Sequence, residues 1–164
     1  MSLPIKRLEI ITDEKLLRQK SRKISKWQGT RLGMKLIKFI AHNDIQCVGL
    51  AAPQVDIYER VFVIYDGKEY AIFINPRIIE IGPLEDTQIE SCISIPGRQF
   101  NVKRPTTIVV KDAVRTKPFS LDGWTSRIWL HEFSHTLGQL ISDKTGLYFT
   151  SQELVSTETS KYIM

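Results

Sequence analysis

The sequence has few of the residues that cross-link or anchor unusual folds. Only two of its 164 residues are cysteines, so a disulfide framework is not expected and a reducing compartment is the simpler prediction. No apolar run is long enough to span a bilayer. Charged residues interrupt the first 17 positions, which argues against a signal-peptide core. We therefore expect a cytoplasmic protein, or one of an organelle matrix, without membrane contact.

Charge of one sign is not concentrated either. The 23 Lys and Arg residues exceed the 18 Asp and Glu residues by only five, which favours no more than weak attraction to an acidic surface such as ribosomal RNA. No dense basic block is interleaved with aromatic residues, so no specific nucleic-acid partner is expected. Internal repeats and low-complexity segments are absent as well.

The patterning predicts one small domain of mixed class. Apolar residues at helical spacing predict an amphipathic helix over 31–43, and the small residues of 48–55 suit a buried strand or a tightly packed loop. From 60 to 110, β-branched and aromatic runs broken by Gly and Pro predict short antiparallel strands. The clearest of these runs are 61–65, 70–74 and 106–110.

A second helix is expected from Asp122 or Thr125 to about Ile141, with Gly146 just beyond its end. Helix, sheet and helix in this order indicate an α+β fold. Residues 1–145 should form the domain, followed by a short and loosely ordered tail over 146–164 that is mostly polar beyond Phe149.

Two of the three histidines fall in one motif, His131-Glu132-Phe133-Ser134-His135. Histidines four residues apart on a helix project from one face and can present two imidazoles to one metal ion. Glu132 could reach a water molecule at that metal, accept its proton and later return it. A histidine pair can also be surface or core decoration, but this concentration of histidine favours a metal-dependent hydrolase.

A catalytic metal site needs a third protein ligand and an open position. Glu153, as in gluzincin-type proteases, is one candidate, although it lies in the short polar tail. Cys92 is the other, because it lies between predicted strands from which a thiolate could face the helix. An isolated cysteine is more often an inert core residue, so the residues alone leave the choice open.

Three blocks in order resemble the peptide deformylases, which carry a G-x-G-x-A-A-x-Q stretch, an E-G-C-x-S stretch and an H-E-x-x-H helix. The corresponding segments here are Val48-Gly49-Leu50-Ala51-Ala52-Pro53-Gln54, Glu90-Ser91-Cys92-Ile93-Ser94 and the His131–His135 motif. The resemblance extends to about Asp143, so that 1–145 is expected to be a deformylase-like catalytic domain. Antiparallel β-sheets would pack around a central helix that bears the motif.

The resemblance implies that Cys92, His131 and His135 bind one divalent ion, usually Fe2+ in the cell and replaceable by Zn2+ or Ni2+. The implied reaction removes the formyl group from N-formylmethionyl nascent peptides and releases formate, with Glu132 shuttling the proton. A transient contact with the ribosome would accompany this role in protein biosynthesis.

The resemblance also implies roles for residues around the metal. The Gln54 amide and the backbone N–H of Ile93 would stabilise the developing oxyanion. Glu90 and Arg104 would form a supporting pair. The residues expected to line the methionine pocket are Val48, Gly49, Leu50, Ile93 and Ile128.

Three positions depart from the family pattern: Cys47 and Ser91 replace glycines, and Ser134 replaces an Asp. Ser91 would cost about 1–2 kcal/mol if its backbone kept a positive φ. Ser134 would lose a charge near the metal, which could weaken metal affinity roughly tenfold or more. These departures motivate an alternative function, a weak or inactive homologue that binds metal or peptide N-termini.

Overall fold

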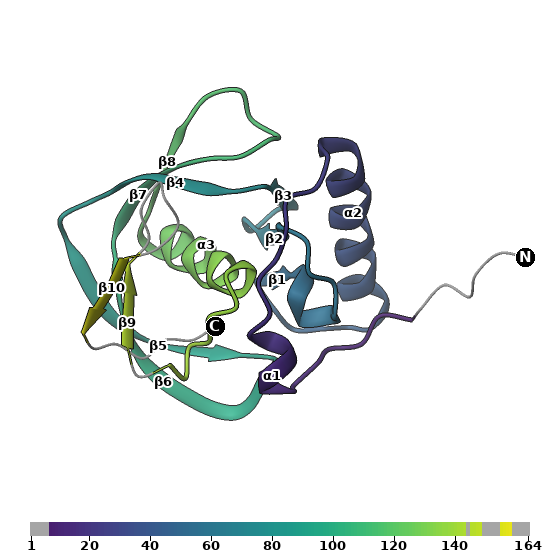
Figure 1. Ribbon diagram of the computed structural model, residues 1–164, viewed down its shortest axis with the longest axis horizontal. Helices are drawn as coiled ribbons and strands as arrows, with labels where there is room; N and C mark the ends of the chain where they lie inside the picture. Colours follow the sequence, from purple (N-terminus) through teal and green to yellow (C-terminus); the bar gives the residue numbers. More distant parts are fainter. Residues whose placement is uncertain (1–6, 144, 149–154, 159–164) are drawn as a thin grey trace, which may run out of the picture.

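Helix α3 (Gly123–Thr136) runs through the middle of the molecule, and most of the strands lie around it (Figure 1). The computed structural model describes residues 7–143, 145–148 and 155–158. A short helix α1 (Glu14–Leu17) precedes the longer α2 (Lys26–His42). The predicted α+β class, with antiparallel sheets and a helix that bears the histidine motif, is confirmed.

One three-stranded sheet lies between the two long helices. Its antiparallel strands are β1 (Gly49–Ala51), β2 (Val61–Tyr65) and β3 (Tyr70–Ile74), and the 3-10 helix η1 (Ala52–Val55) follows β1 directly. Side chains alternate across a strand, so β2 serves two hydrophobic clusters. Phe62 and Ile64 pack with residues of α3, whereas Val61 and Val63 pack with residues of α2.

Two further antiparallel units complete the frame. The strands β4 (Arg77–Ile81), β7 (Thr107–Lys111) and β8 (Phe119–Asp122) form a sheet in the order β4-β7-β8. The strands β5 (Glu85–Cys92) and β6 (Ile95–Pro105) form a long hairpin. The runs predicted at 61–65, 70–74 and 106–110 all correspond to strands. Strands β4, β5, β6 and β8 were not predicted individually, because several of them carry mostly polar side chains.

Helix α2 begins five residues earlier than its apolar spacing predicted. Ser25 caps it, since its hydroxyl accepts a hydrogen bond from the Gln28 N–H at 3.2 Å. Gly29 then faces the sheet, where an added Cβ would lie 2.6 Å from a side-chain carbon of Ile74. The glycine therefore permits a close approach of the helix to β3 that a larger residue would prevent.

Helix α3 ends at Thr136, so the prediction that it continues to about Ile141 was wrong. The cause is Gly138, which adopts a φ of 71° and turns the chain back, so that the Gln139 N–H donates to the Ser134 carbonyl at 3.0 Å. Leu140 and Ile141, which were expected on the apolar helix face, remain buried beyond the turn.

The expected loose tail over 146–164 falls mostly outside the described residues. Within it, the backbone of β10 (Val155–Glu158) pairs antiparallel with that of β9 (Thr145–Tyr148), which is regular structure that the polar composition did not predict. The division into 1–145 and 146–164 stays a prediction. Among the described residues, no helix has the length and apolar character needed to cross a membrane.

Replacing Gly138 by Ala should lower the free energy of unfolding by about 3 kcal/mol, as measured by urea denaturation. The added Cβ would lie 2.1 Å from the Arg18 carbonyl oxygen, in addition to the strain of a positive φ. Gly123→Ala is the matched control, because Gly123 also has a positive φ of 51° but a Cβ added there would meet no atom within 4 Å. Equal losses in the two variants would contradict this account of the helix end.

Candidate active site and metal centre

Three side chains with metal-ligating atoms converge between the β5–β6 hairpin and α3. The Nε2 atoms of His131 and His135 lie 3.2 Å apart, and the Cys92 Sγ lies 3.5 Å from the His135 Nε2. All three ligand atoms lie within 4.8 Å of one another, and all three residues are buried. The structure thus brings together the three residues that the sequence singled out, whereas Glu153 lies outside the described residues.

The chemistry of this cluster fits a single divalent metal ion. Burial raises the pKa of the Cys92 thiol to about 12, and burial, followed by the neighbouring His131, lowers the pKa of His135 well below its usual range. A cation would compensate both effects, since it favours the thiolate and the neutral imidazole as ligands. Three protein ligands of the Cys/His/His type leave a position open, as catalytic rather than structural sites do.

Glu132 lies beside this cluster, at the wall of a pocket. Burial raises its pKa well above the ordinary value, and its Oε2 has no hydrogen-bond partner among the described residues. A carboxyl group with a raised pKa is suited to exchanging a proton near neutral pH. Gly49 leaves the room for it, because a Cβ there would lie 2.6 Å from the Glu132 Oε1.

Gln54 directs its amide group to the same place from η1. Its Oε1 accepts a hydrogen bond from the Ala51 N–H at 2.9 Å, which fixes the orientation of the side chain. Its Nε2 is then 3.2 Å from the Ser94 hydroxyl and 3.5 Å from the Cys92 Sγ. Ser94 is fully buried, and the sequence did not identify it as a site residue.

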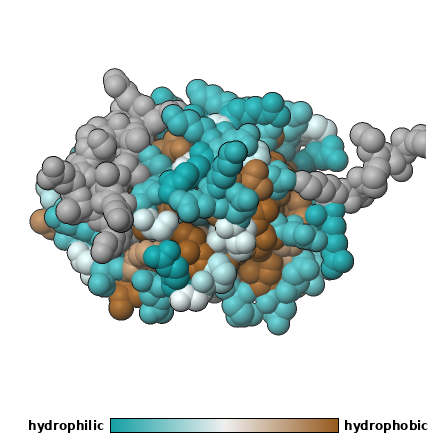
Figure 2. Space-filling model, turned by 60° about the horizontal axis from the view of Figure 1, so that its bottom comes forward, coloured by the Kyte–Doolittle hydropathy of each residue, from teal (hydrophilic) through white to brown (hydrophobic). Residues whose placement is uncertain are grey.

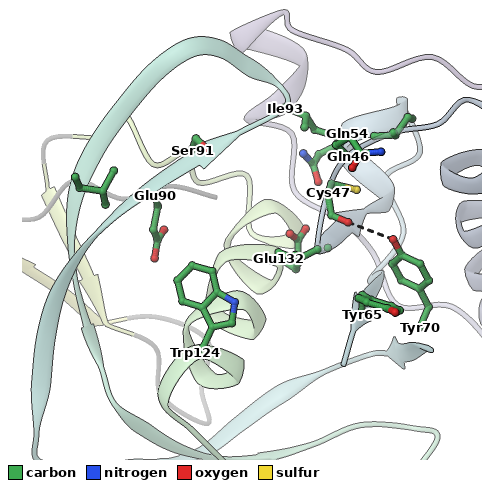
Figure 3. Close-up of a pocket in the computed structure, with 14 residues that line it drawn as sticks. Gln46, Cys47, Gln54, Tyr65, Tyr70, Glu90, Ser91, Ile93, Trp124 and Glu132 are labelled. Atoms are coloured by element: carbon green, nitrogen blue, oxygen red, sulfur yellow. Dashed lines mark hydrogen bonds between the residues drawn. The ribbon is translucent and has the colours of Figure 1, made fainter. Parts of the chain in front are cut away.

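A pocket of about 570 Å³ opens beside Glu132 (Figure 3). Val48, Gly49 and Ile93 line it, as expected of the methionine pocket. Leu50 and Ile128 do not line it but lie in the two core clusters. Leu50 alternates with Gly49 in β1 and therefore faces the α2 side of the sheet, and Ile128 packs with the cluster around Trp129.

The pocket has an aromatic edge that the sequence did not reveal. Tyr65, Tyr70 and Trp124 line it, and the Tyr70 hydroxyl donates a hydrogen bond to the Cys47 carbonyl at 3.2 Å (Figure 3). The side chain of Trp124, from the first turn of α3, is half exposed. Other hydrophobic side chains also reach the surface, where they gather among hydrophilic ones on the face shown in Figure 2.

The polypeptide deformylase family model matches residues 7–148. The chain belongs to this family. It is similar to the crystal structure of peptide deformylase from Thermotoga maritima, with a TM-score of 0.73 and 32% identity over 82% of this chain and 94% of that one. It is also similar to the structure of a probable peptide deformylase from Synechococcus phage S-SSM7, with a TM-score of 0.71 and 30% identity over 82% of this chain and 97% of that one.

Among curated relatives, peptide deformylase 1 of Clostridium acetobutylicum is 37% identical over 135 residues, which are 80% of this chain and 89% of the relative. The resemblance stated from three short blocks is therefore confirmed over most of the chain. Family membership and the Cys/His/His cluster together indicate a single metal ion in this deformylase.

Glu90 connects the metal ligands to the rest of this deformylase. Arg104 donates to both of its carboxylate oxygens at 2.8 and 3.0 Å, so the expected pair is present, and the His131 Nδ1 lies 3.6 Å from its Oε2. Burial alone would raise the pKa of Glu90, but the charge of Arg104 and the contact with His131 bring it below the ordinary value. The group therefore remains a carboxylate.

Arg127 is a member of this network that the sequence did not point to. Its guanidinium donates to the Glu90 Oε1 at 2.7 Å, to the Val102 carbonyl at 3.1 Å and to the Asp86 Oδ1 at 2.7 Å. Since Arg127 comes from α3 and the other three residues come from the β5–β6 hairpin, it ties together the two elements that carry the metal ligands. The available signal was that Arg127 is the only Lys or Arg residue of α3.

The departures from the family pattern have separate structural outcomes. Ser91 is not among the described non-glycine residues with positive φ, so the condition for the predicted strain cost is not met, and its side chain is exposed. The Ser134 hydroxyl donates to the Leu130 carbonyl at 2.7 Å, within its own helix. The buried His135 Nδ1 has no hydrogen-bond partner among the described residues. Cys47 lines the pocket, where burial raises the pKa of its thiol to about 12.

Replacing Arg127 by Met should weaken metal affinity roughly tenfold or more, because it loosens the carboxylate that faces the His131 Nδ1. Competition with a chromogenic chelator measures this affinity. Arg115→Met is the matched control, since Arg115 also bonds a buried carboxylate, that of Asp112, and a backbone carbonyl but does not contact the metal-ligand cluster. Unchanged affinity in the Arg127 variant, or equal losses in both, would show that Arg127 does not position the ligands.

Proposed function

We propose that this chain is a peptide deformylase that hydrolyses the formyl amide at the N-terminus of N-formylmethionyl nascent peptides, giving formate and a free amine. The observation that carries the proposal is the convergence of Cys92, His131 and His135 beside a pocket that also holds Glu132. Membership of the polypeptide deformylase family supports the same reaction.

We propose that these three residues hold one divalent ion, with Fe2+ as the metal in the cell and Zn2+ or Ni2+ as replacements. A sulfur and two imidazole nitrogens suit all three metals. A divalent ion supplies Lewis acidity toward water and toward the amide carbonyl. With three protein ligands, a bound ion would keep a position open, which is consistent with this role.

The proton steps fall to Glu132 in this proposal. Its carboxylate accepts a proton from the attacking water and later donates it to the leaving amine nitrogen. Burial raises the pKa of this group well above its ordinary value, which strengthens it as a proton acceptor compared with an exposed carboxylate. Its Oε2, which has no hydrogen-bond partner among the described residues, is available to receive the proton.

Gln54 and Ile93 are proposed to stabilise the negative charge that develops on the carbonyl oxygen. The Gln54 Nε2 donates toward the cluster from a side chain held by the Ala51 N–H, and it carries no charge that would compete for the metal. The Ile93 backbone N–H directly follows Cys92, so ligation would fix its position.

The methionine side chain of the substrate is proposed to enter the pocket between Val48, Gly49 and Ile93. Glu90, which also lines the pocket, and its partner Arg104 are proposed to act as structural support. From the reaction alone, we also propose a cytoplasmic or organellar location and a transient contact with the ribosome, where formylated peptides emerge.

A formate-release assay with a formyl-Met peptide and anaerobically maintained Fe2+ tests the function. The parent chain should turn over the peptide, and Glu132→Ala should reduce kcat by roughly 10²–10⁴-fold while it keeps the metal, because only the proton-transfer group is lost. Metal content measured on both proteins provides the control. No turnover by the parent chain above that of Glu132→Ala would refute the proposal in favour of an inactive homologue.

A second variant tests the proposed oxyanion donor. Gln54→Leu should lower kcat by roughly 10²–10³-fold with little change in metal content, because a donor to the transition state is removed and no ligand is lost. Gln46→Leu serves as the control, since Gln46 lines the same pocket and, within the described part of the chain, its amide donates only to Asp44, at 3.2 Å. Similar kcat values for the two variants would remove Gln54 from the mechanism.

A further inference from the structure

A second pocket, of about 350 Å³, shares no lining residue with the deformylase pocket. It lies where the segment before α2, the end of β3 and the start of β4 meet the end of β7. Four cationic side chains and one carboxylate line it, with Asn75 and Phe133 among the other lining residues. The charged residues are Lys23, Arg60, Arg77, Lys111 and Asp112.

The walls of this pocket are held in place by Asn75. This residue has a φ of 49°, and its side chain accepts a hydrogen bond from the Ile24 N–H at 3.0 Å and donates to the Ile24 carbonyl at 2.7 Å. Its backbone N–H donates to the Arg60 carbonyl at 2.8 Å. Three chain segments are thereby joined, so that Lys23 and Arg60 are placed on a defined backbone frame.

The lining also contains an unfavourable pair of like charges. Arg77 of β4 and Lys111 of β7 are direct cross-strand partners in the antiparallel register. Like charges at directly opposed positions destabilise a sheet. Within the described part of the chain, neither side chain forms an ion pair that would relieve the repulsion, and the same is true of Lys23.

The one carboxylate in the pocket does not neutralise these cations. The Asp112 Oδ1 accepts hydrogen bonds from the backbone N–H groups of Val114 at 3.1 Å and Arg115 at 2.9 Å. Its Oδ2 is bound by the Arg115 guanidinium. With both oxygens engaged there, Asp112 shapes the adjacent turn and forms no ion pair with Lys23, Arg77 or Lys111.

We propose that this pocket binds phosphate groups, a function separate from deformylation. Several cations around one concave space suit a multivalent anion, and arginine guanidinium groups match the oxygens of a phosphate. A bound phosphate would also offset the repulsion between Arg77 and Lys111. The phosphates can belong to a free polyphosphate compound or to an RNA backbone, since the recognition chemistry is the same.

Binding of inorganic tripolyphosphate, by titration calorimetry, and of a short fluorescent single-stranded RNA, by anisotropy, tests the proposal. The parent chain should bind at least one probe, and Arg77→Glu should weaken that binding roughly tenfold or more. The same variant should raise Tm by about 1–3 °C in the absence of probe, because the like-charge pair becomes an opposite-charge pair. Lys111→Glu reverses the other member of the pair and should behave in the same way.

Lys35→Glu is the matched control. It changes a Lys to Glu at an exposed position of α2 that lines neither pocket. The metal centre is the same in this variant, so any signal that comes from chelation of the metal by the probe will be the same as well. Tripolyphosphate binding that Arg77→Glu loses would establish a site for free polyphosphates, and binding of RNA alone would establish recognition of its backbone. Binding of neither probe, or equal loss in Arg77→Glu and Lys35→Glu, would overturn the proposal.

Discussion

The carboxylate of Glu90 connects the two elements on which the candidate metal centre depends. The β5–β6 hairpin carries Cys92, α3 carries both histidines, and an arginine from each element donates to Glu90. A buried carboxylate is stable only when it is paired and hydrogen-bonded, so loss of either arginine would be costly. The need to satisfy this charge therefore fixes the hairpin against the helix, and the His131 Nδ1 faces the same carboxylate.

Close packing around α3 explains why small residues surround the site. Gly49 gives room to the Glu132 carboxyl group, and Gly29 lets α2 approach the other side of the same sheet. The central sheet consequently has apolar clusters on both faces, and its first strand leads directly into η1 and Gln54. This arrangement buries the ligands and Glu132. Their burial is in turn the main cause of their shifted pKa values.

The sequence predicted those features that local patterns encode. The histidine motif, the apolar strands and the order of three blocks led to the cluster and to the family, whereas helical spacing alone could not choose Cys92 over Glu153. Periodicity also overextended α3, because the burial of Leu140 and Ile141 continues past the turn at Gly138. Arg127 and Ser94 escaped notice because their roles depend on contacts between distant segments. A strain cost at Ser91 was predicted only for a backbone with positive φ, as the glycine usual at that position could adopt.

The central claim is that one sulfur and two imidazole nitrogens from these two elements form a single metal site. X-ray absorption spectroscopy at the edge of the bound metal measures this ligand set directly. For protein loaded with one equivalent of Zn2+, the account predicts one sulfur ligand at about 2.3 Å and two histidine nitrogen ligands at about 2.0–2.1 Å. A first coordination shell without sulfur, or with a single histidine, would contradict it.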